Sequence, residues 1–533
     1  MLNRPLSSPV FAFRTRALCA AMATAALLVT AGLPAAQAAY SPPSSNVAWL
    51  PAGADADVDK AFAQGKAEKK PVLVYWGAKW CPPCNQLKAT LFNRQDFAER
   101  SKSFVAVHID GDLPGAQKLG ARFKVRGYPT MILFSPDGQE ITRLPGEVDA
   151  PQVMNVLQMG LAGGRPIKTV LDEARAGKPV SANEWRMLSF YSWDTDETQL
   201  VSPNDRPGLL AQLSAAAPAS EAEASTRLLL KALAESDEGK GIKPDAATRE
   251  RVKKLLADPV ASRTLMDVLV NAAPDVVNAL APAAGPDRTA LAGAMDSALQ
   301  RLQADASLSR SDRVSALIAR VGVARLDQPK EALRPKLPAP LLKEVRDMAA
   351  AMDKEITDGY ERQAVISSAA YALGEAGLWT ESDALLKSNL SKSHSPYYLM
   401  SHLGGNAKKQ GKKAEALGWY EKAFNTSEGP ATRLQWGSSY LTALVDMAPQ
   451  DSAKIEKVAA QLFTEAAGQE GAFYERSARS LQKVGVELGK WNAKGAHQAT
   501  LDRLRAQLAP VCGKLPAADG QKTTCEGLIK TRA

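Results

Sequence analysis

The sequence is short of the residues that build many catalytic and metal-binding sites. Its 533 residues include only four histidines: His108, His394, His402 and His497. They are scattered, so the sequence offers no hydrolase triad and no two-histidine metal pattern. We interpret His108, in a strand-like segment, as a packed residue rather than a base. A Gly-rich phosphate loop is also missing, and we therefore expect no metal and no organic cofactor.

Clustered positive charge is missing as well. The net charge of +9 comes from 66 basic and 57 acidic residues, which are spread along the chain without a long run of Lys or Arg. Because a nucleic-acid-binding surface needs clustered charge, we expect no nucleic-acid partner. Apolar residues make up 45% of the chain and charged residues 23%, as in ordinary folded proteins.

Long apolar runs are confined to the first residues. No stretch after residue 38 reaches eighteen apolar residues, so we expect no membrane span in the mature chain. Within residues 1–38, three arginines without any acid precede an uncharged, Ala/Leu-rich run, and the sequence Ala36-Gln37-Ala38 follows. This order is typical of a secretory signal peptide cut before Ala39, with an uncleaved membrane anchor as the alternative. We expect an exported, periplasmic protein.

Residues 39–162 alternate between helical and strand-like patterns, which predicts a small α/β sandwich. The turn signal Asp137-Gly138 predicts a hairpin between the last two strands. The predicted strands are 71–78, 104–110, 131–134 and 140–144. The predicted helices are 55–70, a single helix from the first cysteine motif to about 101, 116–123 and 150–161.

The rest of the chain is rich in Ala, Leu, Glu and Lys, and it predicts an all-α domain of helical hairpins. Ser181 and Glu184 fit a capping box at a helix start. Residues 163–360 show no convincing repeat, whereas residues 361–510 show a 34-residue period, the spacing of tetratricopeptide repeats. Residues 397–430 fit that consensus well and 363–396 less well.

The 34-residue period rests on pairs of residues that recur at that distance: Gly377 and Gly411, Ser382 and Ala416, Leu386 and Tyr420, and Pro396 and Pro430. The alternative is an ordinary Ala/Leu-rich helical bundle. Neither interpretation predicts a catalytic site in this region. As a solenoid it would offer a concave surface for a peptide or protein partner.

Removing the leader leaves four cysteines in two pairs, which suits two disulfides in an oxidising compartment. Cys512 and Cys525 lie in the tail, residues 511–533, with Gly, Pro and Asp between them. We predict a structural disulfide that staples a C-terminal loop. A second redox pair or two free thiols are the alternatives.

The other pair lies in Trp80-Cys81-Pro82-Pro83-Cys84, between a predicted strand and a predicted helix. Cys81 at the helix N-cap would be stabilised as a thiolate by the helix dipole, and Cys84, one turn further in, would be the resolving thiol. The pair is thus predicted to exchange disulfides. A purely structural disulfide and half of a zinc site are the alternatives.

This motif, together with Arg126-Gly127-Tyr128-Pro129-Thr130 before an apolar strand, resembles the thioredoxin family. The resemblance implies a thioredoxin fold in which Pro129 is cis and packs beside the cysteines. It also implies that the backbone before Pro129 pairs with an extended partner segment. Trp80, Tyr128 and Thr130 would contact that partner, a thiol- or disulfide-containing protein, and the electron donor or acceptor stays unknown.

The sequence departs from the family at two positions. Tyr75 stands where thioredoxins usually carry a buried Asp that assists proton transfer to the resolving thiol. Tyr128 is bulkier than the aliphatic residue usual before the cis proline, which would narrow the choice of partners.

The residues between the cysteines bear on redox direction. Pro82 and Pro83 have no N–H to donate to the Cys81 sulfur, which favours a reducing couple. Lys79 and Lys88 oppose this, but we expect them to be exposed and screened by salt. The leading hypothesis is a reductase-leaning thiol–disulfide oxidoreductase with a helical domain that holds protein partners. The alternative is a chaperone-like scaffold whose helical repeats bind clients.

Overall fold

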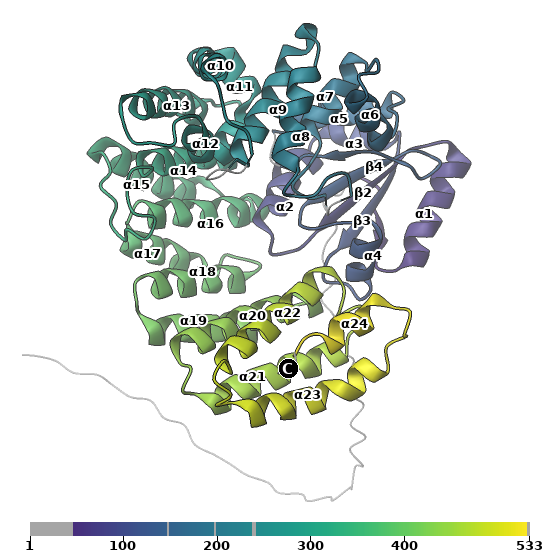
Figure 1. The fold of residues 1–533 in the computed structure, drawn as a ribbon, viewed down its shortest axis with the longest axis vertical. Helices are drawn as coiled ribbons and strands as arrows, with labels where there is room; N and C mark the ends of the chain where they lie inside the picture. Colours follow the sequence, from purple (N-terminus) through teal and green to yellow (C-terminus); the bar gives the residue numbers. More distant parts are fainter. Residues whose placement is uncertain (1–45, 147–148, 197–198, 237–240, 530–533) are drawn as a thin grey trace, which may run out of the picture. The chain divides into compact units, whose positions relative to one another are not determined.

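The structure, a computed structural model, describes residues 46–146, 149–196, 199–236 and 241–529 (Figure 1). The predicted signal peptide lies outside the described residues. The N-terminal part is built on a five-stranded sheet in the order β1-β3-β2-β4-β5. Strands β1, β3 and β2 run parallel to one another. Strand β4 runs antiparallel to β2, and β5 runs antiparallel to β4. The strands are β1 (Leu50–Ala52), β2 (Val72–Gly77), β3 (Val105–Asp110), β4 (Thr130–Phe134) and β5 (Glu140–Leu144).

Four of these strands and the Asp137-Gly138 hairpin confirm the prediction. β1 was not predicted, because three residues are too few to display an alternating pattern.

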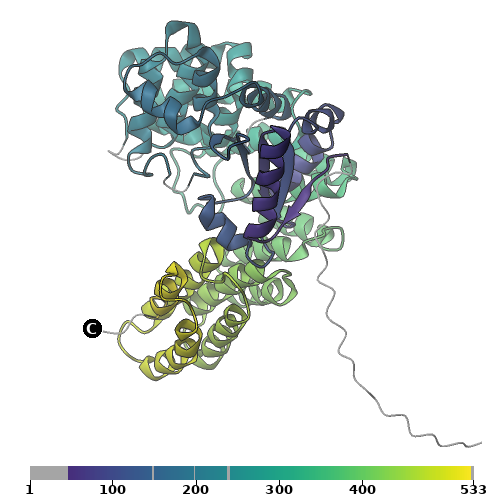
Figure 2. The same cartoon turned by 90° about the vertical axis from the view of Figure 1, so that its right-hand side faces the viewer.

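Helices cover both faces of the sheet. The helices are α1 (Asp55–Glu68), α2 (Pro82–Leu87), α3 (Gln95–Ser101), α4 (Ala116–Arg122) and α5 (Ala150–Leu161), with a π-helix η1 (Lys88–Phe92). Val72, Val74 and Trp76 of β2 pack on the side of α1 and α4. Leu73 and Tyr75 face α2, η1, α3 and α5. Figure 2 shows α1, in purple, over one face of the sheet.

The single helix predicted from the cysteine motif to residue 101 is wrong. The chain forms α2, then η1, and after a break at Asn93 begins α3. The wider turn of η1 brings Lys88, Leu91 and Phe92 to the buried side together, which a regular pattern with a lysine in it does not predict.

The remainder of the described chain is helical, as predicted. The helices are α6 (Ile167–Arg175), α7 (Ala182–Phe190), α8 (Arg206–Ala216), η2 (Ala219–Glu221), α9 (Ala222–Ala234), α10 (Ala246–Ala257), α11 (Pro259–Thr264), α12 (Met266–Leu280), α13 (Pro286–Ala304), α14 (Arg310–Ala324), α15 (Ala339–Glu355), α16 (Gly359–Glu375), α17 (Trp379–Asn389), α18 (Pro396–Lys409), α19 (Lys413–Thr426), α20 (Pro430–Met447), α21 (Ser452–Ala467), α22 (Glu475–Trp491), α23 (Gln498–Gly513) and α24 (Gly520–Glu526).

None of the described helices is long and apolar enough to cross a membrane. The capping box at Ser181 is present, with Glu184 N–H donating to the Ser181 hydroxyl and Ser181 N–H donating to the Glu184 carboxylate.

The first helices after residue 162 pack onto the sheet domain. Met187 and Phe190 of α7 belong to the same buried cluster as α5. Just after α7, Asp196 forms an antiparallel bridge with Val125, and the Arg126 N–H donates to the Thr195 carbonyl at 3.3 Å. The chain around residue 162 is therefore a continuous packed region rather than an exposed linker.

Residues 34 apart occupy equivalent places in successive helix pairs. Gly377 joins α16 to α17 and Gly411 joins α18 to α19, with φ values of 77° and 72° that favour glycine. Pro396 and Pro430 stand in the first turns of α18 and α20, where a missing N–H costs nothing. The period in the sequence is thus the period of the helical hairpins.

The C-terminal segment differs from the predicted loop. Cys512 lies in α23 and Cys525 in α24, and a disulfide joins them with a Cα–Cα distance of 5.5 Å. Asp519 caps α24 by accepting the Gln521 N–H. The Gly, Pro and Asp residues between the two cysteines thus mark one short turn between two helices rather than a longer loop.

Candidate active site

Cys81 and Cys84 lie where β2 leads into α2, and a disulfide joins them with a Cα–Cα distance of 5.3 Å. Cys81 is the N-cap of α2, as predicted, and its sulfur accepts the Cys84 N–H at 3.3 Å. Pro82 and Pro83 fill the first two helical positions, so neither offers an N–H. Cys84 is fully buried, and Cys81 is 2% exposed.

Two further contacts fix the loop that carries Cys81. The side-chain amide of Asn85 donates to the carbonyls of Lys79 and Cys81, at 2.9 and 2.8 Å. The Tyr128–Pro129 peptide is cis and brings the Tyr128 carbonyl oxygen to 3.6 Å from the Cys81 sulfur. The two sequence motifs, whose contacting residues lie 47 positions apart, therefore meet at one sulfur.

Tyr128 and Thr130 hold the cis-proline loop in place. The Tyr128 ring packs so closely on Gly111 that a Cβ there would lie 2.5 Å from the ring. The Tyr128 hydroxyl accepts a hydrogen bond from Gln117 at 3.1 Å, and Thr130 is buried and donates to the Gly127 carbonyl. These contacts position the loop, and partner contact by either side chain stays a prediction.

Trp80 packs against the helical region. Its indole N–H donates to the Thr432 hydroxyl of α20 at 2.8 Å. Its ring stacks on Tyr398 of α18, with a centroid distance of 5.9 Å, and lies 5.1 Å from the ring of Trp436. The face beside the cysteines that the resemblance assigns to a partner is thus partly covered by the same chain.

Arg476 of α22 links Trp80 to the cis-proline loop. Its guanidinium lies 5.3 Å from the Trp80 ring and 5.2 Å from the Tyr128 ring. It also pairs with Asp112 at 2.7 Å, in a bridge whose two side chains are each 13% exposed. Asp112 in turn accepts from the N–H and hydroxyl of Thr432.

Other helical residues bind the backbone that leads into the motif. His394 lies 3.0 Å from the Lys79 carbonyl, and Gln363 donates to the Trp80 carbonyl at 3.2 Å. The Lys79 ammonium pairs with Glu428. Helix α16 also packs against α2.

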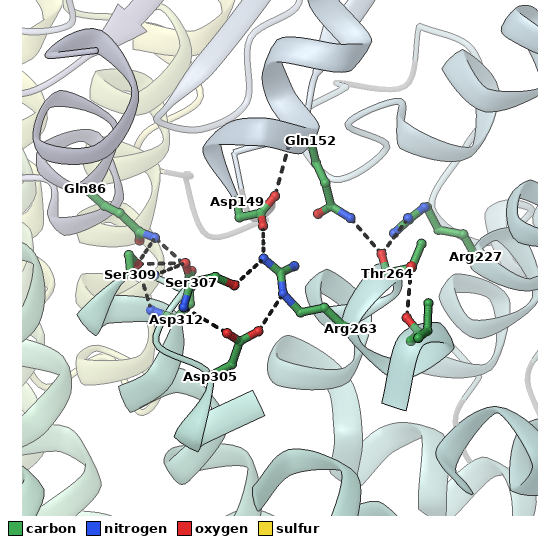
Figure 3. Close-up of polar contacts among 11 residues, drawn as sticks. Gln86, Asp149, Gln152, Arg227, Arg263, Thr264, Asp305, Ser307, Ser309 and Asp312 are labelled. Carbon is green, nitrogen blue, oxygen red and sulfur yellow. Dashed lines mark hydrogen bonds and ion pairs between the residues drawn. The ribbon is translucent and has the colours of Figure 1, made fainter. Parts of the chain in front are cut away.

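A polar network joins α2 and the start of α5 to the helices opposite them (Figure 3). Arg263 binds Asp149 at 2.6 Å and Asp305 at 2.8 Å. Gln86 of α2 donates to Asp312, which belongs to the capping box of α14. The helices opposite the site are therefore fixed relative to α2 by several independent contacts.

Three ionisable groups lie buried or largely buried under the site. Lys88 is fully buried, which corrects the expectation that it is exposed, and its ammonium lies 5.0 Å from the Tyr360 ring. Burial lowers the pKa of Lys88 to about 7, and attraction to Asp110 offsets only part of this. Burial, with repulsion from Asp112, raises the pKa of Asp110 to about 7. His108 is packed, as predicted, and burial lowers its pKa to about 3.

Cys81 lines a cavity of about 380 Å³ together with Trp80, Tyr128 and Arg476. A cavity of about 750 Å³ adjoins it and shares six lining residues: Pro82, Pro83, Arg126, Gly127, Tyr128 and Tyr398. Both cavities have one wall in the sheet domain and one in the helical region. Among the described residues, no group of His, Cys, Asp or Glu is placed to hold a metal ion.

Comparison with known proteins agrees with this geometry. Residues 58–160 match the family model described as a thioredoxin-like domain. This part of the chain is a thioredoxin-like domain. The match covers strands β2 to β5, the cysteine motif and the cis-proline loop, while β1 and the helices beyond α5 lie outside it.

Three relatives are similar over this domain. The thiol:disulfide interchange protein DsbD 2 of Pseudomonas aeruginosa is 32% identical over 20% of this chain and 19% of its own length. The thiol:disulfide interchange protein DsbD of Pseudomonas fluorescens is 33% identical over 23% and 21%. A thioredoxin of Mycolicibacterium smegmatis is 36% identical over 14% of this chain and 66% of its own. The chain thus spans about a fifth of the length of the two interchange proteins.

Sequence reasoning missed the groups that come from the helical region and those buried under the site. Asn85, one residue after Cys84, could have been noticed as a polar residue on the inner side of a helix start. Arg476 and Thr432 carried no signal, because their role follows from contact with residues more than three hundred positions away.

Proposed function

We propose that this chain is a thiol–disulfide oxidoreductase whose redox centre is the Cys81–Cys84 pair. The observation that carries the proposal is the place of Cys81, which caps α2, accepts the Cys84 N–H and lines a cavity. A sulfur at a helix N-terminus is stabilised as a thiolate, the form that attacks disulfides. The names of the relatives, thiol:disulfide interchange protein and thioredoxin, agree with this chemistry.

The reaction follows from the order of the two sulfurs. The Cys81 thiolate attacks one sulfur of a partner disulfide, and the other partner sulfur leaves as a thiolate. Cys84 then attacks the Cys81 sulfur, which releases the partner as a dithiol and leaves the Cys81–Cys84 disulfide. The chain loses two electrons and the partner gains them, so an electron donor must restore the dithiol.

We infer that the couple is reducing. Within the described residues, the Cys84 N–H is the one backbone N–H that donates to the Cys81 sulfur, and Pro82 and Pro83 have none to offer. A thiolate with fewer donors is less stabilised, which shifts the couple away from strong oxidants. Equilibration with glutathione measures the potential, and a value near the −120 mV typical of strong oxidants would contradict a reducing couple.

The partners we propose are exported proteins that carry thiols or disulfides, met in the periplasm. The helical region supports this proposal because it forms the second wall of the cavity beside Cys81. The export is inferred from the signal-like order of residues 1–38. A scaffold that binds clients without redox chemistry is the competing function, and it would not need Cys81.

Disulfide reduction by the purified chain tests the proposal. Cys81→Ser is expected to lower the rate by roughly a thousandfold or more, because the attacking thiolate is gone. Cys84→Ala should still attack and should accumulate mixed disulfides. Cys512→Ala/Cys525→Ala is the matched control and should keep the wild-type rate. Disulfide reduction that survives Cys81→Ser would refute the proposal. Client protection that survives it, in a chain whose wild type reduces no disulfide, would favour the scaffold.

A further inference from the structure

The larger cavity lies next to the redox pair but does not contain it. Of the two cavities, Cys81 lines the smaller one, and Arg126, Gly127 and Tyr128 line both. A segment that reacts at Cys81 and runs along these shared residues would reach the larger cavity. The larger cavity, about 750 Å³, has the size at which proteins hold drug-sized molecules, and it is far too small for a folded domain.

Three helices that alternate along the chain, α14, α16 and α18, supply most of the helical wall of the larger cavity. Ser315 of α14, Ser368 of α16 and Ser401 of α18 each line it and are half-buried. Tyr371 and Tyr398 add two phenol groups to the same wall. Hydroxyl groups both donate and accept hydrogen bonds, so this wall matches the amides and hydroxyls of an uncharged polar ligand.

Charge is scarce in the described part of this lining. It contains no Lys or Glu, and its only charged residues are Arg126, Asp194 and Asp312. Both carboxylate oxygens of Asp312 already accept hydrogen bonds, from Gln86 and Ser309. Burial lowers the pKa of His402 to about 4, so its ring is neutral at pH 7. An acidic ligand group placed against the helical wall would lose water without gaining a positive partner. A basic group would find there only Asp312, whose two oxygens already accept hydrogen bonds.

We propose that the larger cavity binds an extended segment of the redox partner in which the reacting cysteine is flanked by small, uncharged polar residues. The inference rests on the proposed redox function and adds the substrate class to it. The helical region then selects the segment, while the thioredoxin-like domain reacts with its sulfur. Folded proteins whose disulfides lie inside rigid structure are excluded by the two walls.

Short synthetic peptides test this selection directly. Each carries one cysteine joined by a disulfide to thionitrobenzoate, with neutral (Gly, Ser, Asn), acidic (Asp, Glu) or basic (Lys, Arg) flanks. Cys81 attacks the peptide sulfur and releases thionitrobenzoate, and Cys84 then closes the protein disulfide and releases the peptide thiol. We expect the reduced chain to react about tenfold faster with the neutral peptide than with either charged one.

A charge placed in the wall should change that selection. Ser368→Lys, and independently Ser315→Lys, are expected to raise the rate of the acidic peptide relative to the neutral one by about tenfold. Ser297→Lys, on the exposed face of α13 and outside the lining, is the control and should leave the ratio unchanged. Two positions on different helices guard against a single variant that fails to fold.

Equal rates for all three peptides, or a disulfide within a folded protein reduced as fast as the neutral peptide, would overturn the substrate class. An unchanged ratio in both lysine variants would do the same. Reaction with a small uncharged disulfide, hydroxyethyl disulfide, separates this failure from the failure of the redox function. A chain that reduces this probe but does not discriminate among peptides keeps the proposed function and loses only the inference.

Discussion

The two disulfides of this chain are almost equally buried, but their surroundings differ. The four cysteines are between 0 and 3% exposed. Cys81 nevertheless borders a cavity, caps a helix and lies beside a carbonyl oxygen. Cys512 and Cys525 lie within the hydrophobic cluster formed by the last helices. Burial alone therefore does not distinguish a redox pair from a structural one, whereas the neighbouring groups do.

The environments of the ionisable groups near the two disulfides also differ. In the thioredoxin-like domain, burial disfavours the charged forms of both Asp110 and Lys88. Near the C-terminal pair, hydrogen bonds from the Gln521 N–H and the Tyr474 hydroxyl lower the pKa of Asp519. Unfavourable buried charge tends to gather at functional sites, so this difference agrees with the proposed redox role of Cys81–Cys84 and the predicted structural role of Cys512–Cys525.

The stability effect of each disulfide is the largest test of this comparison. Cys512→Ala/Cys525→Ala is expected to lower the free energy of unfolding by about 3 kcal/mol, because the bond closes a loop of thirteen residues. Cys81→Ala/Cys84→Ala, with a separation of three, should lower it by only about 1.5 kcal/mol. Urea unfolding measures both. A larger loss for the Cys81–Cys84 pair than for the Cys512–Cys525 pair would reverse the assignment.

The pH dependence of stability provides the next test. The pKa of Asp110 is about 7 in the folded chain against 3.8 as its reference, so between these values the folded state keeps a proton that the unfolded state has lost. This group's contribution to stability therefore falls as the pH rises from about 4 to about 7. Asp110→Asn should raise the free energy of unfolding by about 2 kcal/mol at pH 8, with little change at pH 4.

Asp137→Asn is the matched control for Asp110→Asn, because Asp137 is exposed in the β4–β5 turn, where Asn is equally suited. Its unfolding energy should follow that of the wild type at both pH values. If the Asp110→Asn chain were less stable than the wild type at pH 8, the Asp110 carboxylate would be stabilised by its neighbours rather than destabilised by burial.

The smallest expected effect concerns the contact between the thioredoxin-like domain and the helical region. Trp80→Phe keeps an aromatic ring at the position but removes the N–H that donates to Thr432, and should cost about 1 kcal/mol. Because Thr432 also binds Asp112, a double-mutant cycle with Thr432→Val isolates the indole bond. A coupling energy of zero in urea unfolding would mean that this bond does not hold the helical region to the redox site.

Local features of the thioredoxin-like domain were predictable from the sequence, because they depend on residues close together. The apolar run of β2, the Asp137-Gly138 hairpin and Cys81 as a helix N-cap follow from spacing and from helix or turn chemistry. The π-helix at Lys88 was not predictable, because tertiary packing draws a lysine inward against the regular period.

The helical half of the site was beyond sequence reasoning. Arg476 and Thr432 lie far along the chain, and nothing near them in the sequence marks them as neighbours of Trp80. The 34-residue period predicted the hairpins but not which of their faces meets the cysteines. That choice depends on side-chain contacts between helices and sheet, such as Gln363 with the Trp80 carbonyl.

The docking of Trp80 into the helical region has a consequence for how the chain can be divided. Thioredoxin-like domains are commonly regarded as portable modules, yet truncation after residue 162 would strip this one of the aromatic neighbours of its indole, of the arginine that neutralises Asp112, and of Met187 and Phe190 from its core. The smallest autonomous unit is therefore much longer than the domain that homology delineates. An excised fragment would expose the aromatic surface of Trp80 beside Cys81, which the helical region covers in the intact chain.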